Sequence, residues 1–211
     1  MDNNKVIENM DIKWLYDRNK FKELGFCKLK DIASKLSFKD GMITAHKFLY
    51  NEEWNEELQN IGVELLYILK NEYKKEWDAD WRNDAFLGTA CDITLKYDQR
   101  YMAFKNAFEK ALNPPAELLI ELARCCYCPG TPPISYEQAI SLLKESLLKH
   151  PYKQAAALLK SIYSSMRDTD NEQYWSKVLD QTKDENMHEL EPAFLREKRG
   201  CRSSHCKDEE R

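Results

Sequence analysis

Three cysteines lie close together in the middle of the chain, at Cys125, Cys126 and Cys128. Tetrahedral zinc sites usually take one pair of ligands two to four residues apart and a second pair from elsewhere in the chain. Cys125 and Cys128 have the separation of a first pair. The second pair would come from Cys201, His205 and Cys206. This pattern supports one hypothesis, a protein that depends on zinc or on its cysteines.

The opposing interpretation is structural. The cysteine cluster falls in an expected helix with apolar neighbours, where cysteine behaves as a small hydrophobic residue. A cysteine nucleophile also needs a nearby base, and His46, His150 and His188 are scattered along the chain. The sequence contains no Gly-rich phosphate loop and no His-Glu-x-x-His or Gly-x-Ser-x-Gly motif. We therefore expect no enzyme activity, no cofactor and no bound metal.

Residues 77–84 form the most acidic and aromatic short stretch, Trp-Asp-Ala-Asp-Trp-Arg-Asn-Asp. Alternating carboxylates could bind a metal, but an EF-hand loop needs a glycine and a distal glutamate that are absent here. We expect instead that Asp78 or Asp80 caps the helix that follows. The tryptophans would then pack the N-terminal part of the chain against the rest.

Composition favours a soluble globular or repeat protein, because 43% of the 211 residues are hydrophobic and 32% are charged. No stretch approaches the roughly 20 apolar residues that span a bilayer, and the sequence begins without a secretory signal. Residues 41–100 carry 12 Asp/Glu against 7 Lys/Arg. An acidic face repels phosphate backbones and could steer a basic protein, although a solvated helix face explains it equally simply. We expect a cytoplasmic protein with reduced thiols and neither a membrane nor a nucleic-acid partner.

Helical periodicity dominates the sequence, and no stretch shows the alternation of a strand. The longest pattern covers residues 54–77, with glutamates near its start and lysines near its end, which complement the helix dipole. Shorter helices are expected at residues 12–24, 29–36 and 42–50. The second half contains three expected helix pairs: residues 82–96 with 101–112, 116–128 with 135–150, and 151–166 with 172–182. The fold class is therefore all-α.

The three pairs share a spacing. Leu122, Cys126 and Tyr127 precede Leu158, Ile162 and Tyr163 by 36 residues. A single helix pair cannot bury its apolar face, so this repetition indicates pairs that stack on one another.

One segment carries a family pattern most clearly. Ala139, Leu143, Leu147 and Pro151 follow the order small, large, apolar and proline. Together with Phe86-Leu87-Gly88, this order makes residues 82–183 resemble tetratricopeptide or Sel1-like repeats. Lys160 departs from the family pattern, which usually has glycine there, and Tyr174-Trp175 stands where a small residue is usual.

The resemblance implies stacked helical hairpins in a short right-handed solenoid. The expected organisation is an N-terminal helical region at residues 1–80 that packs on the repeats. Three helix pairs follow at residues 81–184, and a polar, disordered tail covers residues 185–211.

In this family, ligands lie in a concave groove lined by the first helix of each pair. The resemblance places nine residues there: Arg82, Thr89, Asp92, Glu117, Arg124, Tyr127, Gln154, Ser161 and Ser165. Arg124 and Tyr127 lie on adjacent turns, and their residue types carry much of the energy of protein interfaces. The alternative is that these are ordinary surface residues, or are covered by the N-terminal helices.

The sequence therefore predicts a non-catalytic scaffold that binds a protein partner and sequesters or bridges it. A compact, acidic, stand-alone chain of this kind suits an inhibitor, such as the immunity protein of a toxin. An adaptor would bind short peptides more weakly, and the zinc- or cysteine-dependent protein remains the alternative class.

Overall fold

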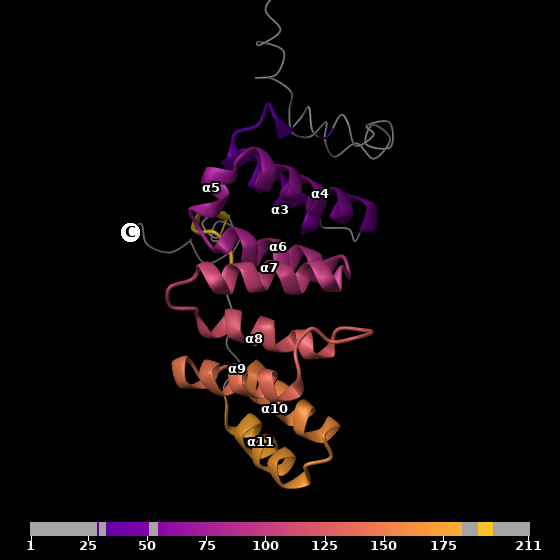
Figure 1. Ribbon diagram of the computed structural model, residues 1–211, viewed down its shortest axis with the longest axis vertical. Coiled ribbons are helices and arrows are strands. Elements are labelled where there is room, and N and C mark those ends of the chain that lie inside the picture. Colours follow the sequence, from indigo (N-terminus) through magenta and orange to yellow (C-terminus); the bar gives the residue numbers. More distant parts are fainter. Residues whose placement is uncertain (1–28, 30–32, 51–54, 183–189, 196–211) are drawn as a thin grey trace, which may run out of the picture.

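The computed structural model describes residue 29 and residues 33–50, 55–182 and 190–195. All regular structure in these residues is helical, which confirms the all-α class. The helices follow one another along the long axis of the molecule (Figure 1). Their bounds are α3 Phe38–Leu49, α4 Glu56–Glu72, α5 Lys74–Asp78, α6 Arg82–Ile93, α7 Tyr97–Lys110, α8 Ala116–Arg124, α9 Tyr136–Lys149, α10 Lys153–Ser165 and α11 Thr169–Gln181. The helix predicted at residues 12–24 lies outside the described residues.

The helices pack in successive pairs: α3 with α4, α6 with α7, α8 with α9, and α10 with α11. Contacts of α4 with α6, α7 with α8, and α9 with α10 join each pair to the next. The three pairs expected in the second half of the chain are thus present, and α3 and α4 add a pair before them.

Polar side chains begin several helices. Ser135 caps α9 in a capping box, in which its hydroxyl accepts from Gln138 N–H and the Gln138 side chain accepts from Ser135 N–H. Asp168 caps α11 by accepting from Asn171 N–H. Serine and aspartate are residue types that favour this position. Asp80 accepts a hydrogen bond from Arg82 N–H at the start of α6, although the N-cap position predicted for Asp78 or Asp80 is held by Trp81.

The single long helix predicted for residues 54–77 is wrong, because the chain leaves the helical conformation at Tyr73 (φ −115°, ψ 46°) and starts again as α5. The Tyr73 hydroxyl donates to the Leu36 carbonyl, and its ring packs 6.1 Å from the ring of Phe38. Tertiary contacts to the segment around α3 thus accompany the break, where the sequence has neither proline nor glycine.

The predicted boundary between residues 96 and 101 is also wrong, since α6 ends at Ile93 and α7 begins at Tyr97. Leu95 adopts the left-handed conformation (φ 57°) that closes a helix, usually with glycine. Lys96 N–H donates to Cys91 O and Leu95 N–H to Asp92 O, the two bonds of a Schellman motif. Further along, α8 ends at Arg124 and continues as a 3-10 turn through Tyr127, and Pro151 lies in the loop before α10.

Three apolar cores follow one another along the stack. The first-pair core surrounds Trp77 and joins α3, α4, α5 and α6. The middle core joins α6, α7 and α8 around Phe104. The last-pair core joins α8, α9, α10 and α11 around Leu159. The buried Trp77 attaches the N-terminal helices to α6, as expected from the sequence.

Gly88 lets α6 and α7 approach closely. A Cβ atom at this position would lie 2.7 Å from the ring of Phe104, which is fully buried. Phe104 has no room to move away.

A buried carboxylate ties four helices together next to Trp77. Asp84 on α6 is fully buried and accepts hydrogen bonds from Trp77 Nε1 at 3.0 Å, Lys70 Nζ at 2.8 Å and Lys110 Nζ at 2.6 Å. These donors come from α5, α4 and α7, respectively.

Residues 190–195 differ from the disordered tail predicted for residues 185–211. Leu195 is buried in the first-pair core, and Leu190 packs against the middle core. The apolar residues of this segment are the ones that pack in the cores. The other residues assigned to the tail, 185–189 and 196–211, lie outside the described part of the chain.

Candidate protein-interaction surface

The nine residues predicted to line a groove lie on or directly after the first helices of three pairs. Arg82, Thr89 and Asp92 are on α6; Glu117 and Arg124 are on α8, with Tyr127 in the turn after it; Gln154, Ser161 and Ser165 are on α10. Tyr127, Ser161 and Ser165 are exposed, five others are half-buried, and Glu117 is buried.

A contact between helices brings two of these residues together. Arg124 Nη2 lies 3.8 Å from Asp92 Oδ2, which connects α8 with α6. Helices α8 and α10, which carry other predicted residues, also contact each other.

Arg124 is held in place at the end of α8. Its Nη1 donates to both oxygens of Glu121, at 2.8 and 3.0 Å. Burial alone would lower the pKa of Arg124, but the charges of Glu121 and Asp92 outweigh that effect and raise it. With 42% of its side chain exposed, Arg124 presents a fixed positive charge at the surface. A guanidinium whose rotamer is already fixed loses less entropy on binding a partner.

A second arginine lies beneath it. Arg100 on α7 has 5% of its side chain exposed, and its guanidinium is 3.3 Å from Glu121 Oε2 and 3.1 Å from Asp92 Oδ1. Two arginines and two carboxylates thus alternate across α6, α7 and α8. We call these four residues, Asp92, Arg100, Glu121 and Arg124, the charge cluster. Sequence analysis missed Arg100 and Glu121; the three-residue spacing of Glu121 and Arg124 was the available signal.

Tyr127 forms the aromatic side of the surface and is 41% exposed. Its ring packs against Tyr136 at a centroid distance of 5.8 Å, so the first residue of α9 supports it. Burial raises the pKa of the Tyr127 hydroxyl, which stays protonated and can both donate and accept at neutral pH.

Two of the predicted residues do not open onto this surface. Glu117 is buried and accepts a hydrogen bond from the Tyr152 hydroxyl at 2.9 Å. The Gln154 side-chain oxygen is buried without a hydrogen-bond partner. Both lie near the start of their helices, and Tyr152 covers Glu117.

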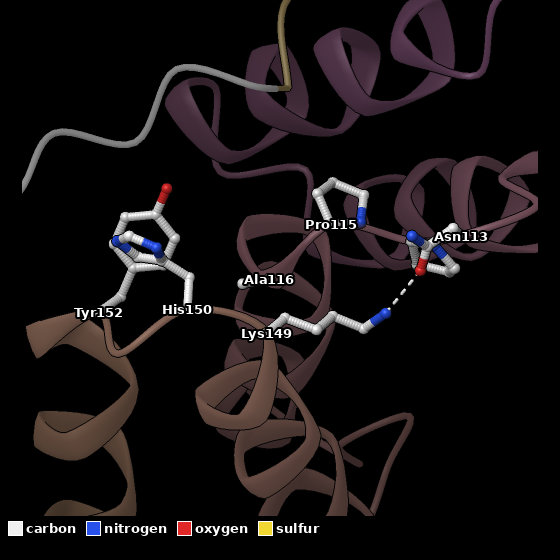
Figure 2. Close-up of a pocket in the computed structure, with 7 residues that line it drawn as sticks. Asn113, Pro115, Ala116, Lys149, His150 and Tyr152 are labelled. Atoms are coloured by element: carbon white, nitrogen blue, oxygen red, sulfur yellow. Dashed lines mark hydrogen bonds between the residues drawn. The ribbon is translucent and has the colours of Figure 1, made fainter.

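A separate pocket of about 300 Å³ lies between the α7–α8 and α9–α10 loops (Figure 2). Lys149 Nζ donates to Asn113 Oδ1 at 2.7 Å across it, and the rings of His150 and Tyr152 lie 4.3 Å apart. Asn113, Pro114, Pro115, Ala116, Lys149, His150 and Tyr152 line it. It is a polar crevice between two connecting loops, which the sequence analysis did not identify.

The cysteine cluster is buried, with 0% of Cys125, 2% of Cys126 and 6% of Cys128 exposed. Burial raises the pKa of Cys125 to about 12 and that of Cys126 to about 11. The three thiols are therefore protonated at neutral pH in the metal-free protein. In the described part of the chain, no three His, Cys, Asp or Glu side chains are placed to hold a metal ion. Cys201, His205 and Cys206 lie outside it.

We expect iodoacetamide at pH 8 to alkylate Cys126 at least 100-fold more slowly in the folded protein than in urea. A pKa of about 11 leaves roughly 0.1% thiolate at that pH, and burial also blocks access. Because the unfolded thiol ionises near its ordinary pKa, this group's contribution to stability is lost as pH rises from about 9 to about 11. Mass spectrometry of labelled peptides measures the rate. The thiol introduced by Ser161→Cys, at an exposed site, is the control, and equal rates at both positions would refute the assignment.

Comparisons of the chain with protein families, curated proteins and solved structures found no match. None of the helices in the described residues has the length and apolar character needed to cross a membrane. The surface therefore has to be interpreted from its own residues.

Proposed function

We propose that this protein is a non-catalytic scaffold that binds a protein partner and sequesters or bridges it. In this proposal the helix pairs form a short right-handed solenoid of the tetratricopeptide or Sel1-like kind. The first helices α6, α8 and α10 would line its concave side. The stacked pairs and the contacts of α8 with α6 and α10 support this arrangement.

One observation carries the proposal. Arg124 is a fixed, partly exposed cation, and the exposed ring of Tyr127 lies one turn further along the same stretch of chain. Arginine and tyrosine are enriched among the residues whose truncation weakens protein interfaces most. Fixing them before binding lowers the entropic cost of association.

A narrower form of the proposal is an inhibitor, such as the immunity protein of a toxin, acting in the cytoplasm. It rests on the acidic residues between positions 41 and 100. An inhibitor would have a single tight partner and no turnover. An adaptor would instead bind several short peptides weakly.

The test compares Arg124→Ala/Tyr127→Ala with the control Lys177→Ala/Tyr174→Ala, which removes an exposed lysine and an exposed tyrosine from α11. Each chain is used to capture partners from the native extract, followed by mass spectrometry and a measured Kd for the purified partner. We expect one stoichiometric partner, bound at least 100-fold more weakly by the Arg124/Tyr127 variant, since two such residues contribute about 2 kcal/mol or more each.

The control variant should capture the partner as the unmodified chain does. Equal binding by all three chains would place the interface elsewhere. Equal loss in both variants would indicate a general effect on folding, which circular dichroism of each variant detects.

A further inference from the structure

The segment of residues 190–195 returns to the beginning of the helical stack, although it follows α11 at the other end. In Figure 1 it lies beside α5, far from α11. Leu195 is 2% exposed within the first-pair core, and Phe194 packs against the same core. Leu190 packs against the middle core, next to residues of α6, α7 and α8. The segment therefore contacts two cores to which α11 does not belong.

Its conformation is a short turn that buries Glu191, Pro192 and Leu195. Leu195 N–H donates to the Pro192 carbonyl at 2.9 Å, and Pro192 is itself buried. Lys39 Nζ of α3 lies 5.8 Å from the centre of the Phe194 ring, within range of a cation–π contact. The segment thus packs Leu190, Pro192 and Leu195 into the stack. The Phe194 ring, which Lys39 contacts, covers them.

The surface that receives this turn is built by other elements. Trp77, Phe48 and Leu69 of α3 to α5 are fully buried members of the first-pair core that Leu195 joins. Removing the turn would expose the apolar surface that now surrounds Leu195. A contiguous exposed apolar patch of this kind marks a binding site in a folded protein.

We propose that this surface is a peptide-binding site and that residues 190–195 occupy it in cis. The partner it fits is a short segment of another protein with the same chemistry: a leading leucine, a proline turn and an adjacent Phe-Leu pair. Such a segment binds by displacing residues 190–195. The site does not include Arg124 or Tyr127, so it does not rest on the function proposed above.

Competition in cis sets the expected affinity. A segment attached through a short linker has an effective concentration on the order of 1 mM. A free peptide whose intrinsic Kd is about 10 μM would then bind the intact chain about 100-fold more weakly. When the attached segment is released, the free peptide should regain this affinity, which competition had reduced.

The test uses the full chain with Leu195→Asp, which places a charge in an apolar site and should release the segment. The probe is a fluorescein-labelled synthetic peptide carrying residues 188–197, followed by fluorescence anisotropy. We expect the variant to bind this peptide at least tenfold more tightly than the unmodified chain. Leu148→Asp, at an exposed leucine on α9, is the matched control and should behave as the unmodified chain does. A labelled peptide with Leu195 and Phe194 both changed to aspartate should bind neither chain.

The proposal fails if folded Leu195→Asp protein binds the peptide no better than the control variant does. A second variant covers the case in which Leu195→Asp unfolds the protein. A protease recognition sequence is placed within residues 183–189, and the full chain is cut after folding. We expect the cut segment to co-elute with the helical body and to exchange with excess labelled peptide while the helical circular dichroism stays constant. Immediate loss of the segment without peptide binding, or unfolding on its displacement, would show that it is only part of the core.

Discussion

Asp84→Asn is expected to lower the free energy of unfolding by about 3 kcal/mol, since it removes the single charge that Lys70, Lys110 and Trp77 all contact. Breaking a buried ion pair commonly costs about 3–5 kcal/mol. Lys70 and Lys110 are each about one-third exposed and can turn toward water, which places the expected cost at the lower end of that range. Urea unfolding followed by circular dichroism measures the change.

The control is Glu109→Gln on α7, whose carboxylate is 58% exposed and 3.8 Å from Lys105. An exposed pair of this kind contributes about 0.3–0.5 kcal/mol. If both substitutions cost the same, Asp84 does not hold α4, α5, α6 and α7 together as described.

Glu121→Gln is expected to cost about 2–3 kcal/mol and to weaken partner binding as well. Glu121 is 6% exposed and contacts both arginines of the charge cluster. Without its charge, Arg100 and Arg124 share one remaining carboxylate, Asp92, and the cluster gains a net positive charge in a largely buried place. Arg124 would also lose one of the two hydrogen bonds that fix its direction, because glutamine has an NH2 donor in place of one carboxylate oxygen.

A double-mutant cycle separates charge from packing. Arg100→Met removes the buried cation, so adding it to Glu121→Gln should recover about half of the lost stability. Partner binding should not recover, because Arg124 stays without its anchor. Glu145→Gln, at a carboxylate that is 51% exposed, is the control and should be neutral in both measurements. If the changes in the free energy of unfolding caused by the two substitutions simply add, the residues of the charge cluster are not coupled as described.

Much of the helical structure could be predicted from sequence because its signals are local. Ser135 with Gln138, Asp168 with Asn171, and the prolines between pairs all act within a few residues of the boundaries that they mark. Those helix starts agree with the structure within a few residues. Gly88 is also interpretable from the sequence, since its lack of a side chain is what the approach of α6 to Phe104 requires.

The errors come from positions whose usual signal is missing. Leu95 takes the left-handed conformation that ends α6, where glycine is the expected residue, and the predicted end of that helix at residue 96 is wrong. Tyr73 interrupts a strongly periodic pattern through contacts with Leu36 and Phe38, which are distant in sequence. Tertiary contacts override local preference at such positions.

The candidate surface could be predicted only in part, because some of its contacts join residues that are distant in sequence. Arg124 and Tyr127 were identified by residue type and spacing. Arg100 was not, because its contacts with Asp92 and Glu121 join three helices. These contacts of Arg100 depend on where α7 lies over α6 and α8, and no local sequence pattern encodes that position. Glu117 fails for the opposite reason, since its predicted position on α8 is correct but Tyr152 covers it.

The place of Leu195 in the first-pair core also has a consequence for how the chain is made. A ribosome adds about 5–20 residues per second, and roughly 100 residues separate the end of α6 from Leu195. After α3 to α6 have been made, about 5–20 seconds therefore pass before Leu195 covers its part of their apolar surface. During that interval the nascent chain exposes the apolar surface that Leu195 later covers.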